Sequence, residues 1–152
     1  MKLTGLAKYA VIVSMAITTT LPFVAPIAAR AQYITAGCSE MVRSSIRQEN
    51  EAENESDAGD YVGAYSHYQE AAIYRANCVN ETSGRARQWN MFFESMDYFG
   101  LSVQAGRSDL WSDQAEDFHA KAHDLANELL GESLPSDLHD LAQTLWRDTS
   151  SD

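Results

Sequence analysis

The chain has 152 residues, with 22 acidic against 11 basic side chains and a formal net charge of −11. An acidic surface repels phosphate backbones and anionic lipid headgroups, which argues against a nucleic-acid partner and against direct binding to a lipid surface. Aromatic residues make up 10% of the chain, a content typical of a folded protein rather than a disordered one.

The first 31 residues have the pattern of a secretory signal peptide. Lys2 and Lys8 give a positively charged start without acids, an apolar core follows, and Ala29-Arg30-Ala31 provides small residues before a cut at Gln32. A retained membrane helix is the alternative, but three threonines and two prolines interrupt the apolar stretch, whereas a span requires about 20 predominantly apolar residues. We therefore expect export to the periplasm or the extracellular space as a soluble protein, without membrane insertion after signal removal.

The chain left after this cut is the length of one domain. It has 121 residues, and because the signal holds three basic residues and no acid, 8 bases face 22 acids, a formal charge of −14. We expect a single all-helical domain over residues 32–148 and a frayed tail at 149–152. The one proline in this part is Pro135, and no segment alternates in the manner of a strand.

Cys38 allows two interpretations. Ala36-Gly37-Cys38 resembles the lipid-attachment site of bacterial lipoproteins, which would anchor the chain at Cys38. Against this, polar residues separate the apolar core from Cys38, and Thr35 stands where lipoproteins most often carry Leu. The alternative is a disulfide with Cys78, because an even number of cysteines in an exported protein favours pairing.

Periodicity predicts five helices, at Ser39–Ser56, Asp60–Cys78, Arg85–Ala105, 110–130 and Ser136–Arg147. In the first, the apolar residues lie in the first half and the second half carries four glutamates at steps of two, Glu49, Glu51, Glu53 and Glu55. Such steps leave no apolar stripe, so we expect this half to be solvated.

The second helix has a face of aromatic and small residues. The segment 59–71 resembles the turn and second helix of a tetratricopeptide repeat, with the small-aromatic-small signature on Ala64, Tyr68 and Ala71. This resemblance implies stacked helical hairpins, in a tetratricopeptide-like array or an irregular bundle, and a groove that binds a peptide or protein. The candidate partner groove comprises Tyr61, Ala64, Tyr65, Tyr68 and Ala71.

The same hairpin places the two cysteines. Its turn is centred on Ala58, and Cys38 and Cys78 each lie 20 residues from that point. Residues equidistant from the turn of an antiparallel hairpin lie side by side, so a disulfide is geometrically reasonable.

The third and fourth helices supply the apolar core. The third is the most apolar and is expected to lie at the centre, where Gly100 indicates either a close helix crossing or an earlier helix end. The fourth carries a seam at steps of three and four, and the fifth continues it with leucines. The seam residues are Trp111, Ala115, Phe118, Ala122, Leu125 and Leu129.

His119 and His123, four residues apart, are a candidate metal pair, and Glu116 precedes His119 by three residues. No second Glu-x-x-His exists, so surface exposure of both histidines is the simpler expectation, and no cofactor is predicted. The sequence contains no nucleophile elbow, phosphate loop, Cys-x-x-Cys or zinc-protease signature. We expect a non-catalytic interaction or accessory module with a protein partner; a small-molecule or metal-binding bundle is the alternative.

Overall fold

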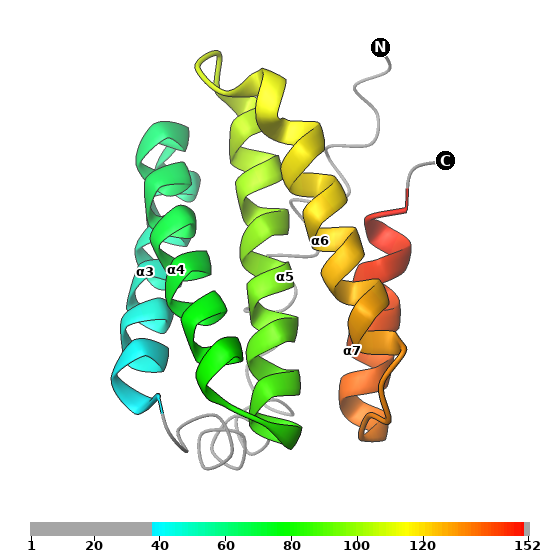
Figure 1. Ribbon diagram of the computed structural model, residues 1–152. Coiled ribbons are helices and arrows are strands. Elements are labelled where there is room, and N and C mark those ends of the chain that lie inside the picture. Colours follow the sequence, from blue (N-terminus) through cyan, green and yellow to red (C-terminus); the bar gives the residue numbers. More distant parts are fainter. Residues whose placement is uncertain (1–37, 151–152) are drawn as a thin grey trace.

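The computed structural model describes residues 38–150 and is all-helical over that range (Figure 1). Its α-helices are α3 (Ser39–Ala58), α4 (Tyr61–Glu81), α5 (Gly84–Arg107), α6 (Ala115–Leu130) and α7 (Ser136–Asp148), with a short 3₁₀ helix η1 (Ser112–Gln114). The predicted all-α class and five helices are confirmed. The predicted signal peptide at 1–31, its cut before Gln32 and the Ala36-Gly37 part of the lipid-attachment pattern lie outside the described residues.

The helices are arranged as consecutive antiparallel hairpins (Figure 1). Each helix packs mainly on its neighbours in the sequence, and α5 lies between α4 and α6. Most α5 side chains are buried, which confirms the prediction that this helix is central. None of the helices in residues 38–150 is both long and apolar enough to cross a membrane.

Two apolar clusters hold the helices together. The larger joins α5 to α6 and α7 through Phe92, Phe99, Leu129 and Leu138, and it extends to Val42 and the Cys38–Cys78 disulfide. The smaller joins α3, α4 and α5 and is made of two tyrosines, three alanines and a leucine: Ala52, Tyr65, Tyr68, Ala72, Leu101 and Ala105.

Gly100 lies at a close approach of α4 and α5. A Cβ atom built on Gly100 would lie 2.8 Å from the ring of Tyr68. Because α5 continues to Arg107, the close crossing and not an early helix end explains this glycine.

A disulfide joins Cys38 and Cys78 at the open end of the α3–α4 hairpin, with a Cα–Cα distance of 5.7 Å. The pairing confirms the prediction from the symmetry about Ala58. At the other end of the hairpin, Gly59 adopts φ 82°, a left-handed conformation that favours glycine, and Asp60 Oδ1 caps α4 by accepting from Gly63 N.

Three expectations for local structure are wrong. The acidic half of α3 is not solvated throughout, because α3 is one continuous helix in which Ala52 is fully buried. The fourth helix begins at Ala115, not at residue 110, so Trp111 precedes it and stacks on Tyr65 with ring centroids 4.1 Å apart. Thr149 is buried, not frayed, because its hydroxyl donates to Leu145 O.

Candidate functional site: a charged cluster inside the α3–α4–α5 layer

Helix α5 presents polar side chains to the interior at a seven-residue interval. Asn90, Asp97 and Gln104 are 0%, 2% and 4% exposed. Seven residues are close to two helical turns, so the three lie on one face. Contacts show where that face points, because Asn90 accepts from Arg75 of α4 and Gln104 bonds to Ser56 of α3.

The face of α3 that meets them is also largely polar. Its residues follow at steps of three and four and are Val42, Ser45, Glu49, Ala52 and Ser56. The Ser45 hydroxyl donates to Val42 O, and Ser56 Oγ exchanges hydrogen bonds with the Gln104 amide at 3.1–3.3 Å. Polar side chains therefore connect α3 to α5.

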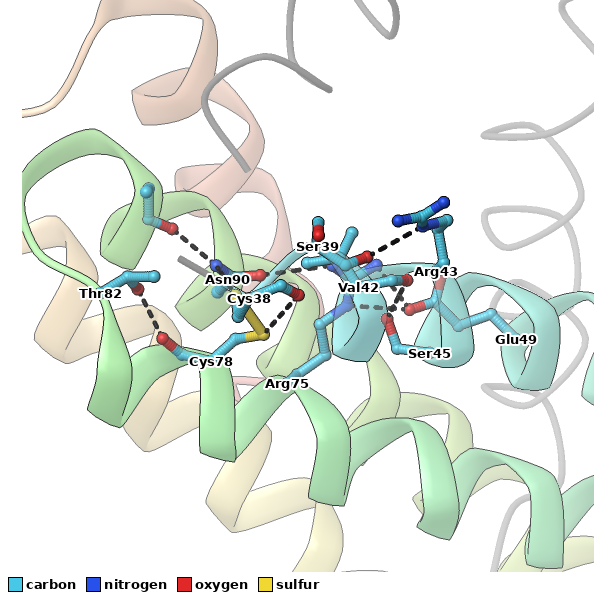
Figure 2. Close-up of a disulfide and its surroundings, with 11 residues drawn as sticks. Cys38, Ser39, Val42, Arg43, Ser45, Glu49, Arg75, Cys78, Thr82 and Asn90 are labelled. Atoms are coloured by element: carbon cyan, nitrogen blue, oxygen red, sulfur yellow. Dashed lines mark hydrogen bonds and ion pairs between the residues drawn. A yellow bond between two sulfur atoms is a disulfide. The ribbon is translucent and has the colours of Figure 1, made fainter. Parts of the chain in front are cut away.

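Arg75 of α4 lies at the centre of this interface, 1% exposed (Figure 2). Its Nε and Nη2 donate to Glu49 Oε1 at 3.0 and 2.8 Å, and its Nη1 donates to Asn90 Oδ1 at 3.3 Å. The guanidinium carbon lies 4.5 Å from the centroid of the Phe93 ring. Such pairing is what a buried cation requires, since an uncompensated charge in the interior is strongly unfavourable.

Asp97 is the unusual member of the cluster. Its Oδ2 atom is buried and has no hydrogen-bond partner among the described residues. Burial raises the pKa of Asp97 well above its usual range, and the charge of Glu49 raises the pKa further, while Arg75 opposes both effects. Asp97 therefore retains its proton at pH values where an exposed aspartate is ionised.

Glu53, one helical turn after Glu49, is half-buried. Burial, with smaller contributions from Glu49 and Asp57, raises the pKa of Glu53 to about 7. The same surroundings act on Tyr68, because burial and the charges of Glu53 and Asp97 raise the pKa of its phenol. We call Glu49, Glu53, Arg75, Asn90 and Asp97 the buried charged cluster.

This cluster can take up and release a proton. Hydrophobic periodicity does not reveal this cluster, because its signal in the sequence is three polar residues at a seven-residue interval in the most apolar helix. Nothing in residues 38–150 groups three or more His, Cys, Asp or Glu side chains in an arrangement able to hold a metal ion.

The two candidate metal histidines contact residues outside α6. The rings of His119 and Phe99 lie 6.2 Å apart, and His123 Nδ1 lies 3.2 Å from Thr149 Oγ1, at hydrogen-bonding distance. Burial lowers the pKa of His119, and the charge of His123 acts in the same direction. Both histidines are half-buried and Glu116 is exposed.

The predicted partner groove is largely internal. Ala64, Tyr65, Tyr68 and Ala71 are at most 6% exposed, and only Tyr61 is half-buried. Their packing against helices of the same chain leaves the four buried residues almost no surface for a partner.

The opposite face of α4 is exposed. Val62 and Ile73 are 44% and 56% exposed, and they lie eleven residues apart, about three turns along one face. Ser66, Gln69 and Glu70 are exposed between them.

No protein-family model, curated protein or solved structure matches this chain.

Proposed function

We propose that the chain is an exported, non-catalytic interaction module whose outward α4 face binds a basic protein segment carrying apolar side chains. The exposure of Val62 and Ile73 on one face is the observation that carries this proposal. Large exposed apolar side chains that align on a single helix face are typical of helix-mediated recognition.

The charge of α4 defines the partner. Arg75 is the only Lys or Arg in α4, and it is buried, whereas Glu70 and Glu81 are exposed. A basic segment complements this surface, and the formal charge of −11 for the whole chain steers such a segment toward it. The resemblance of 59–71 to a tetratricopeptide repeat supports a protein-binding role. The proposed binding surface is the outward face with Val62 and Ile73, and not the buried face with Tyr65 and Tyr68.

The signal-like residues 1–31 and the Cys38–Cys78 disulfide support export, because disulfides persist in oxidising compartments. The disulfide also fixes α4 against α3, so the binding face is preorganised before a partner arrives.

Site-specific photocrosslinking in the native host tests the proposal. A crosslinking residue at position 62 or 73 should capture the same partner, at a basic segment of it. The same residue at exposed Gln143 of α7 is the matched control and should not capture that partner. The substitution Ile73→Glu should abolish capture from position 62; identical adducts from all three positions, or none, would contradict the proposal.

A further inference from the structure

Helix α3 buries few apolar side chains against the rest of the protein. Of its buried side chains, Val42 and Ala52 are apolar and Ser45 is polar. Both ends are nevertheless fixed, by the disulfide at Cys38 and by the turn at Gly59, where Asp60 N donates to Glu55 O at 2.8 Å. The middle of α3 is attached through the buried charged cluster, through the buried Ala52, and through His67 of α4, which lies at hydrogen-bonding distance from Gln48 and 3.5 Å from Glu55.

Carboxylates outnumber cations around this attachment. From α3 and α4, the charges that act on Asp97 are those of Glu49 and Arg75. The Tyr68 phenol of α4 lies close to Asp97 and to Glu49, Glu53 and Asp57 of α3. From α5 come Asp97 and Glu94, and beyond Glu94 lie Lys121 and Glu128 of α6. The one cation at the centre, Arg75, already holds Glu49.

We propose that Asp97 is a proton-operated latch: with Asp97 neutral the middle of α3 closes over α4 and α5, and when Asp97 releases its proton to solvent the middle of α3 opens. Ionised Asp97 adds a negative charge in a buried position facing Glu49, and its Oδ2 has no donor to stabilise that charge. Moving the middle of α3 outward admits water and separates Glu49 from Asp97. The fixed ends make the opening local and reversible.

The burial of Asp97 determines whether the middle of α3 opens when the pH rises or when it falls. Since Asp97 holds its proton in the closed form and loses it more readily in the hydrated open form, raising the pH favours opening. One linked proton changes the ratio of open to closed molecules by roughly tenfold per pH unit.

Amide hydrogen exchange of the whole protein, followed by mass spectrometry from pH 6.5 to 8.5 and corrected for intrinsic exchange rates, tests the latch. Protection of residues 46–54 should fall at least roughly tenfold across this range, while protection of residues 95–103 in α5 stays constant. Unchanged protection of 46–54, or an equal fall in both segments, would overturn the proposal.

Variants separate the latch from a general effect of pH. Asp97→Asn should reduce the fall in 46–54 to less than about threefold, whereas Asp140→Asn, at an exposed α7 carboxylate, should keep the full fall. Should Asp97→Asn not fold, Glu53→Gln decides, since it removes the acid whose pKa is raised to about 7. A fall that persists in Glu53→Gln belongs to Asp97, whereas a fall that disappears belongs to Glu53 and would overturn the proposal. A full fall in Asp97→Asn would also refute the latch.

Discussion

At the scale of single residues, the interior of this protein is organised around Arg75. Its guanidinium is shared among Glu49, Asn90 and the Phe93 ring, so three helices meet at one side chain. A buried ion pair of this kind adds little net stability over apolar packing, but losing one partner is costly because the other charge stays behind. Asp97 has no such partner at Oδ2 and avoids the cost by staying protonated.

Replacing Glu49 by Gln leaves the Arg75 charge buried without its carboxylate. Because Glu49 is itself 21% exposed, solvent offsets part of the effect, and we expect a loss of about 1–3 kcal/mol in the free energy of unfolding measured with urea. Glu51→Gln, at an exposed position of the same helix, should change the value by less than about 0.5 kcal/mol. Equal losses in the free energy of unfolding for the two substitutions would show that burial of the Arg75 charge does not require the Glu49 carboxylate.

Two glycines of α5 give a matched test of the α4–α5 crossing. Gly100→Ala should destabilise the protein by about 1–3 kcal/mol, because the new Cβ would lie 2.8 Å from the Tyr68 ring. Gly106→Ala should stabilise it by up to about 1 kcal/mol, because its Cβ would lie 3.9 Å from Ala115 Cβ and alanine favours the helix. Thermal melting of both variants checks the opposite signs; a stabilising Gly100→Ala would contradict the close approach.

At the scale of the elements, the disulfide compensates for the weak apolar packing of α3. Replacing Cys38 and Cys78 by Ser removes a link that closes a loop with a sequence separation of 40. The chain-entropy relation then gives a loss of about 4 kcal/mol in the free energy of unfolding. Urea denaturation of the double variant measures it, with reduced wild-type protein as the comparison, and a loss below about 1 kcal/mol would mean that α3 is held by its other contacts.

The sequence patterns predicted elements far better than the site. The apolar periods of α5, α6 and α7 are strong, and the equal distances of Cys38 and Cys78 from the turn were enough to pair them. The start of α6 was misplaced because Trp111 continues the apolar spacing although its partner is Tyr65 of α4. The inward face of α3 was missed because packing there uses a glutamate, serines and one alanine, which hydrophobic periodicity does not distinguish from a solvated surface.

At the scale of the whole molecule, the two sides of α5 differ in chemistry. Toward α6 and α7 the core contacts are apolar, and the polar contacts include the Ser95 hydroxyl donating to Ala122 O, Arg87 donating to Glu128 and Lys121 donating to the Tyr98 hydroxyl. Toward α3 and α4 the contacts include the buried cation Arg75 and three acids, Glu49, Glu53 and Asp97. Asp97 and Glu53, whose pKa values are raised, therefore lie on the side of α5 that faces α3 and α4.

The pH dependence can be assigned a sign. Unfolded Asp97 ionises near pH 3.9, whereas in the folded protein its pKa is raised by burial, so above pH 4 the folded state binds more protons and stability falls as the pH rises through the folded pKa. His119 acts in the opposite direction, since its lowered pKa costs stability only as the pH falls below about 6.5. Measurements above pH 6.5 therefore keep the contribution of His119 small.

The free energy of unfolding of wild-type protein and of Asp97→Asn, measured with urea between pH 6.5 and 8.0, is the most direct test of the buried charged cluster. We predict that the wild-type value falls by about 1–2 kcal/mol, close to the 1.4 kcal/mol per pH unit of one retained proton, and that Asp97→Asn at least halves this fall. A wild-type value that stays constant or rises over this range, or an equal fall in Asp97→Asn, would contradict a protonated Asp97 beneath α3.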